Sequence, residues 1–432
     1  MDDADGARTA SPTLGELFRA ATRIGCLGFG GPAGQIALMH RVFVDEKRWI
    51  DEARYLHALS YCTLLPGPEA QQLATYVGWT LRGVAGGLIT GLMFVLPGAA
   101  VVLGLSWLYA AHGETPGVMA ALDGVKAAVL ALVLEALVRV GKRALKGPGD
   151  LAVAGAAFVA LALFGLPFPL VILAAAATGV LRSGPAAVAD AVAVAPPRKR
   201  RVLTTVAFWT AIWLAPLALS VILLGPGHWL SRLGGVFASL AATSFGGAYA
   251  LLAWLQQQVV ETHGWLQAGQ MVDGLGLAET TPGPLVLVNQ FVGFMTGWGQ
   301  GGGMGWALLG AAMASWQTFA PSFLFIFAGA PYAEALRRSA RARGALAAVM
   351  AAVLGVIASL ALWFATHVLF GQINEAPTPW SSRLSIPQPA SLDPLTALLA
   401  IAAGVALMRF RANVVLVVLG CAALGWLRAG LS

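Results

Sequence analysis

The chain has 432 residues, of which 58% are hydrophobic and only 11% carry a charge, with a net charge of +7. Soluble domains contain roughly 25% charged residues, so this chain has too little charge to cover a water-exposed surface. The composition excludes a soluble globular protein and predicts an all-α, polytopic membrane protein. Basic residues gather in short loops between apolar segments, which indicates membrane topology rather than nucleic-acid binding.

Metal, thiol and nucleophile chemistry have no visible basis in this sequence. The three cysteines stand far apart, and the six histidines form no metal-binding pattern. We therefore expect no metal, no cofactor and no enzymatic activity. The polar, acidic start lacks a basic region and a cleavage site, so we expect no cleaved signal peptide.

The first half alternates short helices with long apolar segments. We predict helices over 14–28, 32–50, 55–65 and 69–81, membrane spans over 83–111 and 118–145, and a hairpin of two spans over 151–181. The helices over 55–65 and 69–81 flank Pro66-Gly67-Pro68. Each is too short to cross the bilayer alone, which takes about 20 residues.

After the first half the pattern pauses and then starts again. We predict one extra span over 202–224, helices over 229–244 and 249–260, two half-helices around Pro282-Gly283-Pro284, spans over 304–330 and 345–370, a polar loop over 371–393, and helices over 395–408 and 414–427. The chain thus divides into an N-terminal repeat (1–183), a basic linker (184–201), an inverting span (202–228) and a C-terminal repeat (229–432).

Two copies of one stretch organise the whole chain. The segment from Phe29-Gly30-Gly31 to Pro66-Gly67-Pro68 aligns without gaps to the segment from Phe245-Gly246-Gly247 to Pro282-Gly283-Pro284. Trp49 and Trp265 also match, between the glycine and proline clusters. Chance similarity is a poor explanation, so we interpret the copies as an internal duplication.

Loop charges predict opposite orientations for the two copies. Copy one has four basic residues where copy two has none: Arg41, Lys47, Arg48 and Arg54 against Gln257, His263, Gly264 and Gln270. One span later the bias reverses, since 337–343 is basic and 112–116 is not. Short cytoplasmic loops collect Lys and Arg, so we predict an inverted repeat with a cytoplasmic N-terminus and linker and an external C-terminus. Loop charge that varies freely is the alternative.

Inverted repeats broken by Gly and Pro at matching positions are typical of secondary transporters, whose substrate lies between the broken helices. We predict that Pro68 and Pro284 take the first helical position, and that the helices they begin turn free N–H groups and positive dipole ends toward one anion site. The predicted substrate contacts are Gly30, Gly31, Pro66, Gly67, Pro68, Gln71, Gly246, Gly247, Thr280, Thr281, Pro282, Gly283 and Pro284. Simple helix kinks, with Gln71 bonded in the helix core, are the alternative.

Three ionisable residues stand close to these motifs. Arg23 precedes the first glycine turn by less than two helical turns, and its forked donors suit an oxyanion. Its alternative is snorkelling to the cytoplasmic surface. Glu279 and Glu69 are candidates for proton coupling, and for Glu69 a partnership with the helix dipole is the alternative.

The residues around the breaks resemble the chromate ion transporter family in its long, two-domain form. The resemblance rests on Phe29-Gly30-Gly31-Pro32-Ala33, the run 65–74, Ser244-Phe245-Gly246-Gly247 and the run 277–284, and it covers nearly the whole chain. It implies chromate efflux across the bacterial inner membrane, driven by the membrane potential or the proton gradient, and chromate resistance. Sulfate is the implied competitor. Arg23 fits the family pattern, whereas the second half has Ser239 at the matching position.

Other functions stay open at this point. Within transport, the alternative is uptake or exchange of sulfate or another oxyanion. A membrane enzyme would need a cofactor or nucleophile motif, and a scaffolding protein would have no reason to duplicate broken helices. The expected partners are chromate or sulfate as substrate and the lipid bilayer, with no nucleic acid; a homodimer is left open.

Overall fold

The computed structural model describes residues 11–29, 31–183, 199–245, 247–330, 339–378 and 381–431. Its first half contains α1 (Leu14–Leu27), α2 (Gly31–His40), the π-helical turn η1 (Arg41–Glu46), α3 (Glu52–Cys62), α4 (Glu69–His112), α5 (Pro116–Ala144), α6 (Pro148–Ala162) and α7 (Phe168–Arg182). Then follow α8 (Lys199–Leu224), α9 (Trp229–Thr243), α10 (Ala248–Gln256), η2 (Gln257–Thr262), α11 (Ala268–Thr280), η3 (Leu285–Leu287), α12 (Val288–Gly297), η4 (Trp298–Gly302), α13 (Gly303–Gly329), α15 (Ala340–Leu369), α16 (Pro394–Met408) and α17 (Val414–Leu431).

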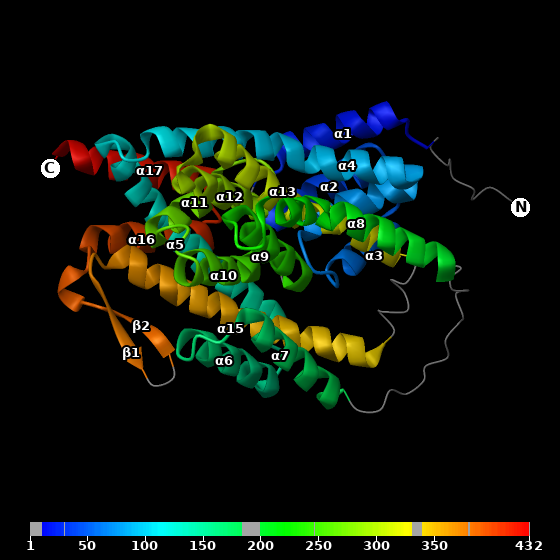
Figure 1. Cartoon of the computed structure of the whole chain (residues 1–432). Helices are drawn as coiled ribbons and strands as arrows, with labels where there is room; N and C mark the ends of the chain where they lie inside the picture. Colours follow the sequence, from blue (N-terminus) through cyan, green and yellow to red (C-terminus); the bar gives the residue numbers. More distant parts are fainter. Residues whose placement is uncertain are drawn as a thin grey trace, which may run out of the picture.

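The long helices form a bundle in which α4, α8 and α15 run roughly along the same direction, while α5 crosses obliquely (Figure 1). Five helical segments of the described chain are long and apolar enough to cross a membrane: 69–112, 116–144, 202–224, 285–329 and 340–369. The hairpin predicted over 151–181 is found as α6 and α7, which both pack on α15. These features confirm a multi-pass helical membrane protein.

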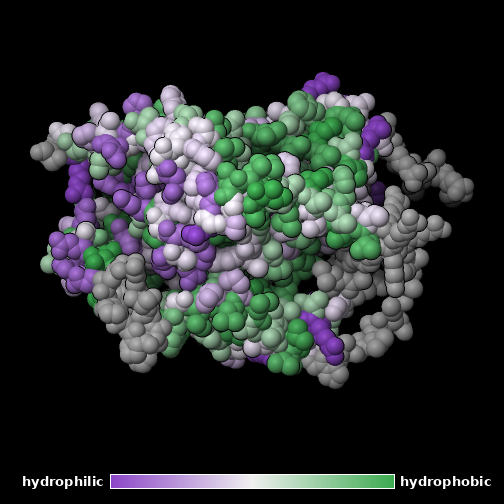
Figure 2. All heavy atoms as spheres, in the orientation of Figure 1, coloured by the Kyte–Doolittle hydropathy of each residue, from purple (hydrophilic) through white to green (hydrophobic). Residues whose placement is uncertain are grey.

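The outer face of α8 exposes large apolar side chains. Leu203, Ile222 and Leu223 are 70%, 77% and 69% exposed. Figure 2 shows apolar residues over much of one face, with polar residues gathered mainly toward the end where α17 lies. Apolar surface of this extent is costly in water and favourable in lipid.

The predicted boundary between 69–81 and 83–111 appears as a kink inside α4. Arg82 and Gly83 have non-helical backbone, with φ of −141° and 61°. A similar interruption separates α12 from α13, where Gly301 has φ of 75°. Glycine permits both bends because it has no Cβ to clash. The long helices of the two halves are therefore both broken near their starts.

The prediction of a polar loop over 371–393 was wrong. This segment contains an antiparallel hairpin of β1 (Ile373–Thr378) and β2 (Ser381–Pro387), followed by a 3₁₀ turn at Pro389–Ser391. The strand pairing becomes irregular between Ala376 and Thr378, where Pro377 has no N–H to donate. The backbone N–H and C=O groups of this segment form no helix, and pairing between the two strands gives them hydrogen-bond partners. Most of the linker predicted over 184–201 lies outside the described residues, while 199–201 begin α8.

Candidate functional site

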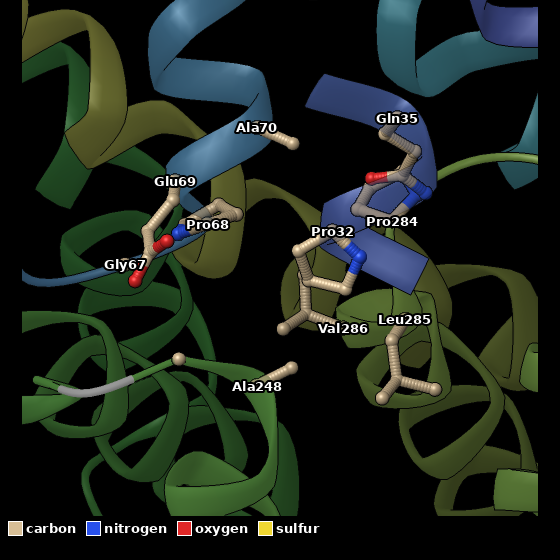
Figure 3. A pocket seen from close by; sticks show the side chains of 11 residues that line it. Pro32, Gln35, Gly67, Pro68, Glu69, Ala70, Ala248, Pro284, Leu285 and Val286 are labelled. Atoms are coloured by element: carbon tan, nitrogen blue, oxygen red, sulfur yellow. The ribbon is translucent and has the colours of Figure 1, made fainter. Parts of the chain in front are cut away.

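A narrow cavity lies where the two Pro-Gly-Pro breaks meet. It is lined from both halves of the chain by Pro32, Gln35, Gly67, Pro68, Glu69, Ala70, Gly247, Ala248, Pro284, Leu285 and Val286. Its volume is only about 20 Å³, about the room that one water molecule needs, so it is narrow in this structure. Figure 3 shows side chains of α2 and of the start of α4 on opposite walls.

Two matching backbone hydrogen bonds join each break to the glycine turn of the other copy. The N–H of Gly67 donates to the carbonyl of Ser244 at 3.0 Å, and the N–H of Gly283 donates to the carbonyl of Gly28 at 3.1 Å. Gly67 matches Gly283 in the duplication, and Gly28 matches Ser244. The same contact is thus made once by each copy, so the duplicated stretches form one unit around the cavity.

Glycine is required at both breaks. Gly67 and Gly283 have φ of 110° and 97°, a region that residues with a Cβ rarely adopt. A Cβ on Gly283 would lie only 3.3 Å from the Cα of Gly98 on α4 and 3.0 Å from Cδ1 of Leu287. A side chain at the second break would therefore strain the backbone and push α4 away.

The helix starts at the cavity differ slightly from the prediction. Pro68 is the N-cap of α4 and Pro284 the N-cap of η3, so each proline stands one position earlier than predicted. The first N–H groups of a helix have no partner within the helix. The starts of α4 and, after Gly247, of α10 therefore bring donors and positive dipole ends to this cavity.

The structure brings part of the predicted set to the cavity wall: Gly67, Pro68, Glu69, Gly247 and Pro284. Other predicted residues belong to the same breaks and turns without lining the wall: Gly31, Pro66, Pro282 and Gly283. Gly30 and Gly246 lie outside the described residues.

Three predicted polar contacts are bonded elsewhere. The hydroxyls of Thr280 and Thr281 donate to backbone carbonyls three residues earlier, at 2.8 and 2.9 Å. Gln71 is fully buried and donates from Nε2 to the carbonyl of Phe319 on α13 at 3.3 Å. The structure therefore does not bring these three side chains to the cavity.

Arg23 is also placed away from the cavity. Its guanidinium donates to Glu46 Oε2 of η1 at 2.7 Å, and its side chain is 47% exposed. The buried face of α1 is formed by other residues, including Leu17 and Ile24. The structure thus does not place Arg23 where the sequence predicted its contact with the anion.

Glu279 lies close to the second break but behind the wall. It is 6% exposed, and its Oε1 accepts a hydrogen bond of 2.6 Å from the hydroxyl of Tyr249 on α10. Glu69 is the one predicted carboxylate that lines the cavity itself. The two carboxylates therefore have different surroundings.

Gln35 of α2 is a cavity residue that the sequence analysis missed. It is 1% exposed, and its Nε2 donates to the carbonyls of Gly28 (3.1 Å) and Gly283 (2.5 Å). It thus ties α2 to the break of the other half. Comparison of the copies could not reveal it, because the matching residue is Leu251. Its polarity four residues after Gly31 was the available signal.

A second buried polar cluster, also missed, joins α11 to α4 and α5. Asp273 is 4% exposed, and its Oδ2 accepts a hydrogen bond of 2.9 Å from the hydroxyl of Tyr109. Lys126 Nζ lies 3.8 Å from Asp273 Oδ1 and 2.8 Å from Asp123 Oδ1. An acidic residue in an apolar half-helix was the signal, since such residues are costly in a membrane and usually have a partner.

Comparison with known proteins gives one family for both halves. The model of the family described as "Chromate transporter" matches residues 15–180 and again residues 231–426. A chromate transport protein of Pseudomonas aeruginosa is 32% identical, over 95% of this chain and 92% of its own length. One from Cupriavidus metallidurans is 32% identical over 80% of each chain, and a probable chromate transport protein of Synechococcus elongatus is 28% identical over 83% of this chain and 86% of its own. No solved structure matches the chain.

Proposed function

Because the chain belongs to the chromate transporter family, we propose that it is a secondary active transporter of a tetrahedral oxyanion. Chromate is the proposed substrate, as the names of the relatives state for those proteins. The proposed direction is efflux across the bacterial inner membrane, with chromate resistance as the result. Sulfate is the proposed competitor because it has the same shape and charge.

The observation that carries this proposal is the cavity between the two breaks. It is lined by matching elements of both copies and closed by the reciprocal bonds of Gly67 and Gly283. Broken helices at matching positions, with N–H groups turned to one site, are how secondary transporters hold anionic groups. We propose that the anion binds there, between the starts of α4 and α10.

We also propose that the two halves have inverted topology. In support, α3 and α11 lie toward opposite ends of the bundle (Figure 1). Tyr61 of α3 donates to the carbonyl of Phe325 near the end of α13, and Tyr109 near the end of α4 donates to Asp273 of α11. Each half therefore sets the end of its long helix against the half-helix of the other. Alternating access would be rocking of one half against the other.

Glu69 and Glu279 are the proposed proton-coupling residues. Glu69 shares the cavity with the anion, and Glu279 lies on α11, which leads into the second break. A carboxylate in such a place changes charge when it binds a proton, so its protonation can be linked to anion binding. Proton relays in transporters are commonly built from buried Asp and Glu.

Flux measurements in proteoliposomes test the proposal. Purified protein should exchange labelled chromate for unlabelled chromate across the membrane, and sulfate should compete. An imposed pH gradient or membrane potential should drive chromate against its own gradient. Absence of chromate exchange in vesicles that contain correctly inserted protein would contradict the function.

Glycine variants test the position of the site. Gly67→Leu and Gly283→Leu should abolish exchange, because both positions have positive φ and lie at the breaks. Gly104→Leu is the matched control, since Gly104 is an α4 glycine with open space around its Cβ position. Normal exchange by either break variant would mean that this break is only a kink. The amount of inserted protein must be measured for all three variants.

A further inference from the structure

The walls of the cavity carry acceptors rather than cations. Among the described residues that line it, Glu69 alone has a formal charge, and there is no Lys, Arg or His. The starts of α4 and α10 each supply roughly half a positive charge. If a dianion entered beside an ionised Glu69, the cavity would contain three negative charges. The two helix starts together would offset only about one of them.

Gln35 adds an acceptor whose orientation is fixed. Its Nε2 donates to two carbonyl oxygens, those of Gly28 and Gly283. If the side-chain amide of Gln35 were flipped, its oxygen would face the carbonyl oxygens at both contacts. Nε2 therefore makes both contacts, and Oε1 makes neither. This Oε1 is buried and has no hydrogen-bond partner, and Figure 3 shows it turned toward the cavity. A buried acceptor calls for a donor, which a fully deprotonated oxyanion does not carry.

Glu69 stands on the opposite wall, at the first position of α4 (Figure 3). Its Oε1 lies 4.0 Å from the Cβ position of Gly247 and accepts no hydrogen bond from the described residues. The titratable group that acts on it is Arg143, from an exposed position on α5, and Glu69 in turn acts on the buried Cys62 thiol of α3. From α2, α10 and η3 no charged side chain reaches the cavity wall. The compensating charge must therefore enter from outside.

We infer that the cavity binds each oxyanion together with one proton, which the ligand shares with Glu69, while Gln35 Oε1 accepts the hydrogen bond of the protonated ligand. This inference rests on the oxyanion transport proposed above. The proton joins an oxygen of the ligand or of Glu69 on the side of entry and is released with the anion on the other side. Only an O–H bond forms and breaks. The transported unit is then a singly protonated tetrahedral oxyanion, such as hydrogen chromate.

The test separates anion movement from proton movement in proteoliposomes. Exchange of labelled for unlabelled chromate at equal pH measures transport alone. A pH-sensitive dye inside the vesicles measures protons that accompany a chromate gradient. We expect wild type to show both signals. Glu69→Gln should move fewer protons per chromate than wild type, because its amide takes up no proton in this pH range. Glu114→Gln is the matched control, since Glu114 lies in the exposed loop after α4, and it should retain both.

The outcomes distinguish this inference from the function on which it rests. No chromate exchange by wild type contradicts the proposed function. Exchange without any proton signal in wild type, or an unchanged number of protons per chromate in Glu69→Gln, overturns the inference and leaves the function standing. Gln35→Met adds a second readout: chromate affinity should weaken most at low pH, where the protonated ligand is abundant. An equal loss of affinity at all pH values would reject the acceptor role of Gln35. If Gln35→Met fails to fold, Glu69→Gln still decides the proton.

Discussion

Loss of Lys126 should destabilise the protein through the buried Asp273. Lys126 is the one cation within ion-pair distance of Asp273 in the described part of the chain, at 3.8 Å. Two unit charges about 4 Å apart attract by about 4 kcal/mol at an effective dielectric constant of about 20. Lys126 lies nearer to Asp123 and is 23% exposed, so we take about half of that value, ~2 kcal/mol, as the cost of Lys126→Met.

A double-mutant cycle isolates this contact. Asp273→Asn removes the negative charge and keeps an oxygen that can accept the Tyr109 hydroxyl. Lys126→Met should therefore lower the midpoint of thermal unfolding in detergent in the wild-type background, and should cost little in the Asp273→Asn background. Lys142→Met, at an exposed position of the same helix, is the control and should be neutral. Equal losses in both backgrounds would show that the ion pair is not the source of the effect.

Three further predictions concern topology, Arg23 and pH. Single cysteines at Lys47 and His263 should be labelled from opposite sides of the membrane, and labelling of both from one side would reject the inverted repeat. Arg23→Gln should keep near-normal chromate affinity because Arg23 is exposed and paired with Glu46; a large loss would mean that Arg23 reaches the anion in another state of the transporter. A hydrogen bond to Glu52 raises the pKa of His40 above its ordinary value of 6.5. The contact stabilises the folded protein at pH values below the pKa that His40 has in the unfolded chain, and this stabilisation is lost as the pH rises through the pKa of His40 in the folded protein. The midpoint of thermal unfolding should therefore depend less on pH over that range in His40→Gln than in wild type.

Local signals made the helices and their breaks predictable. The apolar segments and the Gly and Pro residues that interrupt them placed the kink at Gly83 correctly. One helix ends before each Pro-Gly-Pro motif and another begins directly after it. These signals arise from the steric effects of Gly and Pro on the backbone within a few residues, so they can be predicted from the local sequence. The hairpin of β1 and β2 was missed because these short, mostly polar segments show no sustained alternation of apolar and polar residues.

Side-chain contacts between distant segments could not be predicted in the same way. Arg23 was assigned to the anion because it lies close to the glycine turn along the chain. The direction of a side chain around the helix decides its contacts, and Arg23 is on the exposed side of α1. Gln35 and Asp273 owe their importance to partners in other helices. A duplication draws attention to residues that are identical in both copies, whereas Gln35 corresponds to Leu251 and Asp273 to His57.

The two copies share the backbone conformation of their breaks but differ in the side chains that line the cavity. This difference affects how the site can bind and release a proton. Gly67 and Gly283 share positive φ and make the same hydrogen bond to the opposite turn. A transporter that alternates between two related conformations needs such equivalent hinges, because each half must be able to take the place of the other. Glu69, in contrast, corresponds to Leu285 in the second copy, although both residues line the cavity. A proton taken up at Glu69 therefore changes the charge on one wall only. In the mechanism proposed above, the symmetric backbone would let the halves exchange roles, and the single carboxylate of Glu69 would tie that exchange to one proton.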